Sequence, residues 1–424
     1  MRVWRAWLGV LVCAGSALLA CADSTGVPLS EEAPPADDSA SVVSAPSEPL
    51  EVAPALVLND ERRVRETPPP APPPAPPDSF QPGFHQALRW SESVGGMMTF
   101  RLRVPVGREG GRLRVTFRSG DGTLTLQRAT VAKAGVDGAL ASTPVSLTFN
   151  GQAGFTTPAR TLVTSDPVDF PVTFRDDLDI SFEVRGALAA SAIDAFPGSF
   201  ARPGAFAVMP GPIGGQPFER SSGVATVDVE GPPTRAFVAI GDSITEGYMD
   251  MKNDTRNAWP ALVEDALGVP VVNSGVSGQG FYDALELLDN EVLALQGITD
   301  CIVLLGTNDL GNTGALEQAE ARMVQMVERL KPFCRVWVST LLPKEKTNFG
   351  SYALVKTQRV AFNDWVRKGG TGADVIDLEA VMRRPDNVHL FIEGLGADGI
   401  HPNAAGHKVM AAEVVRVLRE QGGL

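Results

Sequence analysis

Short apolar runs alternate with amphipathic segments through the second half of the chain, and this order limits the fold more than any other feature. From about Arg235 onward the runs have the length of buried strands, and they lie at residues 236–240, 269–273, 301–305, 336–340 and 375–377. Helical periodicity is found at 315–330, 351–368 and 403–419. Alternation of strand and helix predicts a mostly parallel sheet covered by helices on both faces.

The region before it, about residues 80–230, has a period of two instead. Phe100, Leu102 and Val104 alternate with Arg101 and Arg103, as in a strand that buries one face. Similar runs lie at 113–117, 123–126, 145–149, 172–174 and 178–184, with turn sequences at 110–111, 121–122, 150–151 and 165–167. Many short strands at this spacing predict an all-β domain of the sandwich or jelly-roll type.

The N-terminus has the features of an export signal. Arg2 and Arg5 precede the apolar residues 7–19, a run shorter than the roughly 20 residues that a membrane-spanning helix needs. The sequence LLAC that ends at Cys21 resembles the lipobox of bacterial lipoproteins, in which the cysteine is lipidated after cleavage. We therefore expect a lipid anchor on Cys21 and a place in the cell envelope, at the outer membrane or the periplasmic face. The alternative is an ordinary signal peptide that happens to contain a cysteine.

Residues 22–77 are rich in proline, serine, alanine and acidic side chains, and they end in the run PPPAPPPAPP. This composition cannot bury enough apolar surface to fold, so we expect a disordered linker whose proline run is an extended spacer. The predicted division of the chain is a signal peptide at 1–20, a linker at 21–79, a β-domain at 80–232 and an α/β domain at 233–424.

Composition excludes some classes of function. The formal charge of −13 is the opposite of the basic footprint of a nucleic-acid binder, so no nucleic-acid partner is expected. Hydrophobic residues make up 44% of the chain and charged residues 21%, which is typical of a globular protein rather than a membrane bundle. The chain has only 4 histidines, which limits the residues that could act as a general base.

Chemically useful residues follow three of the predicted strands. Ser243 stands between the strand at 236–240 and a predicted helix start, where its hydroxyl would lie at the sheet edge beside backbone N–H groups. Gly278 follows the second strand and Asn308 the third, at the same edge of the sheet. Their amides and that of Ser243 could bind an oxyanion, although serine, glycine and asparagine are also ordinary turn residues.

Asp398 and His401 stand near the C-terminus, just before Pro402 and a predicted helix. A neutral imidazole is the natural base for a serine hydroxyl, and a carboxylate fixes its tautomer. Asp386 and His389 have the same spacing but lack the proline and the helix, so we favour His401.

His407, farther along the predicted helix, is expected at the surface or as a cap. The scarcity of histidine and cysteine argues against a metal site, and neither a metal nor a cofactor is expected.

The segments GDSITEGY, NSGVSG, GTND and DGIHP, in this order, resemble the four sequence blocks of the GDSL/SGNH hydrolases. The resemblance extends from about Arg235 to the C-terminus and implies an SGNH, flavodoxin-like α/β/α domain of three layers. It implies Ser243 as nucleophile, His401 as base and Asp398 as its partner. The oxyanion donors would be the Ser243 amide, Gly278 and Asn308. The preceding β-rich segments GGRLRVTFRS, VSLTFNG and TSDPVDFPV are similar to the jelly-roll domain of many secreted GDSL esterases.

The resemblance implies a serine esterase that hydrolyses short acyl esters, above all O-acetyl groups on carbohydrate. A lipase, lysophospholipase, thioesterase or O-acyltransferase with the same triad is the alternative among enzymes. The alternative that is not an enzyme is a carbohydrate-binding lipoprotein of the cell envelope. The role of the β-domain and the oligomeric state are left open.

Two further cysteines, Cys301 and Cys334, begin neighbouring predicted strands. A disulfide between them is within reach in an oxidising compartment, and two separate buried thiols are the alternative.

Overall fold

The computed structural model of the protein describes residues 79–191, 198–218, 220–249 and 252–423. Cys21, the proline run and the predicted signal peptide lie outside the described residues. Among the helices that the described residues form, none is long and apolar enough to cross a membrane.

A parallel sheet of five strands forms the centre of the second domain. The strands are β12 (Phe237–Gly241), β15 (Val271–Gly275), β16 (Asp300–Leu304), β17 (Arg335–Ser339) and β18 (Asp374–Ile376). Their order is β15-β12-β16-β17-β18, and every neighbouring pair is parallel. The predicted parallel sheet is therefore confirmed, with strand boundaries within two residues of the expected ones.

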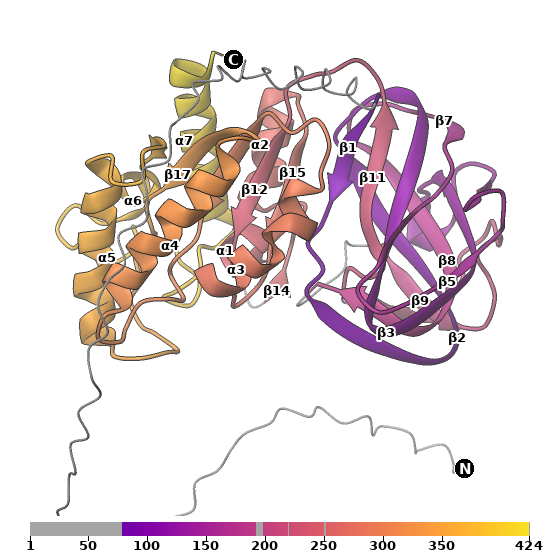
Figure 1. Cartoon of the computed structure of the whole chain (residues 1–424), viewed down its shortest axis with the longest axis horizontal. Helices are drawn as coiled ribbons and strands as arrows, with labels where there is room; N and C mark the ends of the chain where they lie inside the picture. The colour runs from indigo at the N-terminus through magenta and orange to yellow at the C-terminus, as the bar shows by residue number, and fades with distance from the viewer. Residues whose placement is uncertain (1–78, 192–197, 219, 250–251, 424) are drawn as a thin grey trace, which may run out of the picture. The chain divides into compact units, whose positions relative to one another are not determined.

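Helices cover both faces of this sheet, as predicted (Figure 1). One face packs against α3 (Phe281–Leu288), α4 (Ala315–Leu330) and α5 (Tyr352–Arg367). The other face packs against α2 (Trp259–Leu267), α6 (Leu378–Met382) and α7 (Ala404–Gly422). The apolar stripe of each helix explains its position, because a strand buried on both faces needs a hydrophobic layer on each side.

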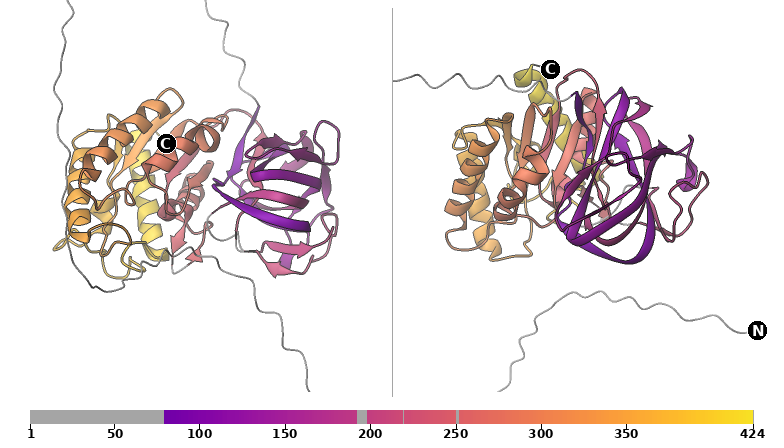
Figure 2. Two further views of the ribbon diagram at one scale, coloured as in Figure 1. Left: turned by 60° about the horizontal axis from the view of Figure 1, so that its bottom comes forward. Right: turned by 45° about the vertical axis from the view of Figure 1, so that its right-hand side comes forward.

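The β-domain is an antiparallel half-barrel built on three long strands. These are β2 (Trp90–Val106), β3 (Gly110–Lys133) and β8 (Asp176–Ala190), which run side by side in the order β3-β8-β2. Figure 2 shows the indigo and magenta strands of this domain curving around its core. The remaining strands are β1 (Phe80–His85), β4 (Val145–Leu147), β5 (Phe155–Thr157), β6 (Leu162–Thr164), β7 (Val168–Val172), β9 (Phe200–Pro203), β10 (Gln216–Pro217) and β11 (Val224–Glu230).

Two local predictions in the β-domain are wrong. The sequence Asp121-Gly122 does not turn the chain, because β3 passes through it with a register shift between Ser119 and Leu124. A β-bulge of this kind accommodates turn-forming residues without ending the strand. The strand expected at 172–174 ends at Val172, since the chain turns there.

The alternation of Arg101 and Arg103 with apolar residues predicts that the outer face of β2 is exposed to solvent. In the structure this face is covered. Arg101 is completely buried, and its guanidinium donates to the Ser181 hydroxyl and to the carbonyls of Gly138, Met209 and Gly211. A guanidinium can be buried when carbonyl oxygens satisfy its N–H groups, so the alternating pattern does not reveal the loops that cover this face.

The β-domain meets the sheet at its β15 edge. Gln86 pairs in parallel with Asn273, and the Ala87 amide donates to the Asn273 carbonyl at 3.2 Å. The adjacent His85 is buried, with Nδ1 donating to the Ala225 carbonyl and Nε2 2.9 Å from the Ser274 hydroxyl. This segment therefore covers an edge of β15 that would otherwise present unpaired backbone groups.

Cys301 and Cys334 are joined by a disulfide, with 5.9 Å between their Cα atoms. Cys301 lies in β16 and Cys334 immediately precedes β17, so the bond ties two neighbouring parallel strands at their amino ends.

Removing this bond should destabilise the α/β domain. The disulfide spans 33 residues, and restricting the unfolded chain over such a loop is worth about 3 to 4 kcal/mol. Urea unfolding of Cys301→Ser/Cys334→Ser, compared with the oxidised wild type, should show a lower midpoint. The reduced wild type is the matched control and should behave like the variant. An unchanged midpoint would contradict the expectation.

Candidate active site

Ser243 lies at the carboxyl end of the central strand, where the chain changes from strand to helix. Asp242 caps the helix α1 (Ser243–Glu246), and its Oδ1 accepts from the Ile244 amide at 3.0 Å. A short polar side chain at this position satisfies one of the free N–H groups of the helix start. Gly247 ends the helix with φ 112°, a conformation that favours glycine. Ser243 is thereby held at the sheet edge that the sequence predicted.

A chain of hydrogen bonds connects Ser243, His401 and Asp398. The Ser243 Oγ is 2.9 Å from His401 Nε2, and His401 Nδ1 is 3.0 Å from Asp398 Oδ2. The other carboxylate oxygen, Oδ1, accepts from the backbone amides of Ile400 and His401 at 2.9 and 2.8 Å. Gly399 permits this tight turn with φ 80°. The structure thus brings together the three side chains that the sequence predicted.

The electrostatics of this chain suit a neutral imidazole beside a charged carboxylate. Burial lowers the pKa of His401 from its ordinary value of 6.5, and the positive charges of Lys344 and Lys346 act in the same direction. Burial acts to raise the pKa of Asp398, but the amides of His401 and Ile400 and the imidazole outweigh it, so that pKa lies below its usual range. An unprotonated imidazole whose Nδ1–H is held by a carboxylate can accept a hydroxyl proton at Nε2.

Gly278 and Asn308 line the same cavity as Ser243 and His401. Gly278 has φ 79°, and a Cβ built on it would meet nothing within 4 Å. Asn308 Nδ2 donates to the Gln279 carbonyl at 3.0 Å, which uses one of the two hydrogens of its amide. The donors expected from the sequence therefore lie beside the serine, as oxyanion stabilisation requires.

The cavity has a volume of about 290 Å³ and an aromatic rim. The Tyr248 ring lies 4.5 Å from the His401 ring, centroid to centroid, and Phe349 is 58% exposed. Asn348 and Lys344 add polar groups to the lining. The cavity therefore combines a flat apolar surface with hydrogen-bonding groups around the serine hydroxyl.

Three buried ionisable groups at or near the cavity were missed from the sequence. Lys344 is 3% exposed, and its ammonium donates to the Thr307 carbonyl at 2.7 Å, next to Asn308. Asp309 accepts from the Phe281 amide at 3.0 Å. Burial raises the pKa of Asp242 to about 7. Lys344 follows β17 at the reactive edge of the sheet, so the rule that located Ser243 could also have located it.

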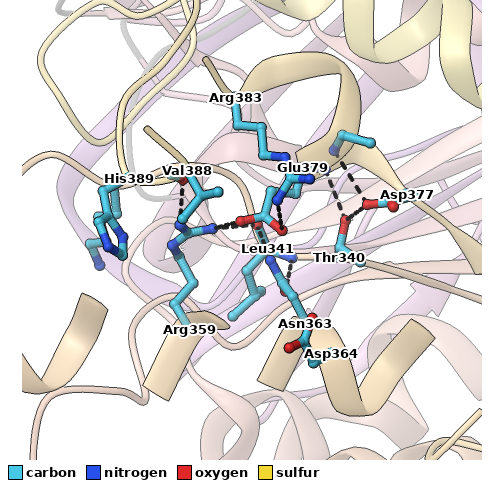
Figure 3. A network of polar contacts seen from close by, with 12 residues as sticks. Thr340, Leu341, Arg359, Asn363, Asp364, Asp377, Glu379, Arg383, Val388 and His389 are labelled. Carbon is cyan, nitrogen blue, oxygen red and sulfur yellow. Dashed lines mark hydrogen bonds and ion pairs between the residues drawn. The ribbon is translucent and has the colours of Figure 1, made fainter. Parts of the chain in front are cut away.

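A buried network holds the loop after β17 in place (Figure 3). Arg359 pairs with Glu379 and also donates to the carbonyls of Leu341 and Val388. Asn363 binds both the amide and the carbonyl of Leu341. The network fixes the start of the loop that leads to Lys344.

That loop also contacts the turn of the histidine. The Glu345 amide donates to the Gly399 carbonyl at 2.8 Å. Because Gly399 lies between Asp398 and His401, the loop supports the turn that carries both side chains.

The remaining histidines of the α/β domain have other surroundings. His389 follows a turn in which its amide donates to Asn387 Oδ1, and Figure 3 shows it beside the Arg359 network. His407 is completely buried, so the surface alternative is wrong, but it does cap a helix, because it accepts from the first amide of α2. Its Nδ1 accepts from the Trp259 amide at 3.1 Å, and burial lowers its pKa to about 4. The described residues contain no group of three or more side chains that could hold a metal ion.

The pH dependence of the reaction should report the surroundings of His401. Activity requires the neutral imidazole, so kcat/KM should fall as the pH drops through the pKa of His401, which lies below 6.5. Lys344→Met removes a nearby positive charge and should move this acid limb to higher pH. Lys368→Met, at an exposed site on the C-cap of α5, is the control and should leave the profile in place. Identical acid limbs in all three proteins would contradict the expectation.

Comparison with known proteins places the α/β domain in a family. Residues 239–409 match the model of the GDSL-like Lipase/Acylhydrolase family. No curated protein matches the chain.

Solved structures similar to the chain differ in how much of it they cover. A lipase/acylhydrolase from Enterococcus faecalis is 24% identical, with a TM-score of 0.37, and covers 44% of this chain and 97% of its own. A carbohydrate esterase family 2 enzyme with a carbohydrate binding domain from Corynascus thermopiles is 18% identical, with a TM-score of 0.38. The match covers 81% of this chain and 99% of that enzyme. A family two carbohydrate esterase from Clostridium thermocellum is 14% identical, with a TM-score of 0.35. The match covers 79% of this chain and 95% of that enzyme.

The matched residues include Ser243, Gly278, Asn308, Asp398 and His401. The chain therefore carries, at residues 239–409 and behind an N-terminal β-domain, a hydrolase domain of the GDSL/SGNH family, a family of carboxylic ester hydrolases.

Proposed function

We propose that the protein is a serine esterase that removes short acyl groups, above all O-acetyl groups, from carbohydrate. The observation that carries this proposal is the hydrogen-bonded chain from Ser243 through His401 to Asp398, at a cavity that Gly278 and Asn308 also line. Nucleophile, base, tautomer-fixing carboxylate and amide donors are the groups that acyl transfer to serine needs.

In the first half of the reaction, the Ser243 Oγ attacks the carbonyl carbon of the ester while its proton passes to His401 Nε2. Asp398 accepts from Nδ1–H and stabilises the imidazolium that forms. The proton then passes from Nε2 to the departing alcohol oxygen as the acyl–oxygen bond breaks, which leaves an acyl-enzyme on Ser243.

The negative oxygen of the tetrahedral intermediate is stabilised by the Ser243 amide, the Gly278 amide and Asn308 Nδ2. These donors come from three loops that rigid strands position, so little reorganisation is needed when the charge develops. In the second half, His401 removes a proton from water as the water oxygen attacks the acyl carbon. The proton then passes from Nε2 to Ser243 Oγ as the bond between Oγ and the acyl carbon breaks, which releases the acid.

The dimensions and lining of the cavity support a short acyl group on a hydroxylated alcohol. A volume of about 290 Å³ lies at the low end of ligand pockets, which run from roughly 300 to 1,000 Å³. A long acyl chain would need an extended apolar groove beside Ser243. The lining instead includes the polar side chains of Asn348 and Tyr248, which suit a hydroxylated alcohol.

Ser243→Ala should lose roughly a thousand-fold or more in kcat on p-nitrophenyl acetate while remaining folded. Wild-type kcat/KM should be highest for the acetyl ester in a series of p-nitrophenyl esters from two to sixteen carbons, and acetylated polysaccharide should release acetate. Ser351→Ala, at an exposed N-cap of α5 without a side-chain hydrogen bond, is the control and should match the wild type.

Equal activity of the wild type and Ser243→Ala would refute the triad. An optimum at eight or more carbons would refute the short acyl group and favour the lipase alternative. A folded wild type that cleaves none of the esters would favour a binding role.

We also propose that the protein is exported and anchored in the cell envelope through lipid on Cys21. The charged and apolar residues before Cys21 support export, and the disulfide between Cys301 and Cys334 agrees with an oxidising compartment.

Full-length protein expressed in a bacterial host should enter the detergent phase of a Triton X-114 separation. Cys21→Ser should move it to the aqueous phase or leave the signal uncleaved, because the acylated residue is lost. Cys13→Ser, in the apolar run, is the matched control and should not change partitioning. A wild type found only in the aqueous phase after signal cleavage would refute the anchor.

A further inference from the structure

A second cavity of about 240 Å³ lies where the β-domain meets α3, and it shares no lining residue with the catalytic cavity. Trp90, Asp121 and Arg160 line it from the β-domain. Glu286 of α3 and Asn290 of the following helical turn, Asp289–Leu293, line it from the hydrolase domain. None of these residues takes part in the reaction described above, so the cavity needs an explanation of its own.

The walls carry three arginines and three carboxylates, and two of each are paired within the cavity. Arg89 binds Asp283 at 2.8 Å, and Arg160 binds Asp121 at 2.9 Å. An anionic ligand would meet the carboxylates, and a cationic ligand would meet the guanidinium groups, so the walls favour an uncharged ligand. Paired arginines and carboxylates offer donors and acceptors side by side, which suits hydroxyl groups because each hydroxyl both donates and accepts.

Trp90 supplies a flat apolar surface at this cavity. Its side chain is 47% exposed, and the Arg89 guanidinium lies 5.5 Å from its ring centroid. Exposed indole rings are unfavourable in water and are common where an amphipathic ligand binds. A sugar ring fits such a site, because its C–H groups can pack on the indole while its hydroxyl groups reach the polar walls.

The backbone of the cavity wall has unusual geometry. The bulge of β3 between Ser119 and Leu124 carries Asp121, whose amide donates to the Ser91 hydroxyl at 2.8 Å. Arg160 has φ 55°, in the left-handed region that non-glycine residues seldom occupy, and its amide donates to the Gly120 carbonyl at 2.8 Å. Strained positions of this kind concentrate at binding and active sites.

Residues near the two ends of α3 line the two cavities. Gly278 lines the catalytic cavity and α3 begins three residues later at Phe281, while Glu286 and Asn290 line the second cavity. A rise of about 1.5 Å per residue separates Phe281 from Asn290 by roughly 13 Å along the helix axis. A polymer chain that occupied both cavities would have to extend over at least this distance.

We propose that this second cavity is a carbohydrate subsite, which binds an unacylated, uncharged sugar unit of the polymer whose acyl group is presented to Ser243. This inference rests on the proposed function, since it assumes a carbohydrate ester as substrate. It gives the β-domain a direct part in substrate binding, through Trp90 and the bulge of β3.

Kinetics on a small and a polymeric ester test the subsite. Trp90→Ala should leave kcat/KM for p-nitrophenyl acetate within about twofold of wild type, because that ester reaches only the catalytic cavity. For the acetylated polysaccharide that the wild type cleaves best, xylan or glucomannan, KM should rise about tenfold with kcat little changed. Asn290→Ala, which removes only an exposed amide, should raise KM in the same direction.

Tyr282→Ala is the matched control, since Tyr282 is a 66% exposed aromatic residue on α3 that lines neither cavity. It should leave KM for both substrates unchanged. Binding without catalysis is measured by affinity electrophoresis of Ser243→Ala in gels containing the deacetylated form of the same polymer. Ser243→Ala should be retarded, and Ser243→Ala/Trp90→Ala should not.

The outcomes separate the subsite from the proposed function. If the wild type cleaves p-nitrophenyl acetate but no acetylated polysaccharide, the carbohydrate substrate is wrong and the subsite falls with it. If the wild type cleaves the polysaccharide and Trp90→Ala and Asn290→Ala keep the wild-type KM, the proposed function stands and the subsite is refuted. An equal rise of KM in Tyr282→Ala would likewise refute a specific subsite.

Discussion

Parallel pairing of β12 with β15 on one side and β16 on the other brings the catalytic groups into one cavity. Ile240 is in register with Ser274 and with Val303, so the loops after these strands start side by side although they are far apart in the sequence. Those loops carry Ser243, Gly278 and Asn308 to the same edge of the sheet. The proposed reaction depends on this register, because a shift of one strand would move Gly278 or Asn308 away from Ser243.

The β-domain contributes to this edge as well as adding a second cavity. Gln86 pairs with Asn273 near the end of β15, three residues before the loop that contains Gly278 begins. The neighbouring His85 is buried, and burial lowers its pKa to about 4, so its imidazole is uncharged at neutral pH. A sheet edge covered in this way holds its last strand more firmly, and the donors that follow β15 are positioned by both domains.

Buried charges below the cavity have a different role. Burial lowers the pKa of Lys344, while the charges of Asp242 and Asp309 favour its protonated form. A buried cation is tolerated only when nearby groups compensate for lost hydration, and here the Thr307 carbonyl also accepts from it. Through this hydrogen bond the ammonium holds the turn that precedes Asn308.

The sequence alone determined the two-domain order, the parallel sheet and the three residues of the hydrogen-bonded chain. This was possible because strand and helix periods are local, and because Ser243, Asp398 and His401 stand in the segments GDSITEGY and DGIHP, which resemble sequence blocks of the GDSL/SGNH hydrolases.

Only the tertiary structure decided the rest. It alone showed that Arg101 and His407 are buried, that Asp121 lies in a bulge rather than a turn, and that Trp90 meets α3 at a cavity. Whether a polar side chain is exposed or covered depends on loops and domains that pack on it from distant parts of the chain, and such contacts leave no periodic trace in the sequence.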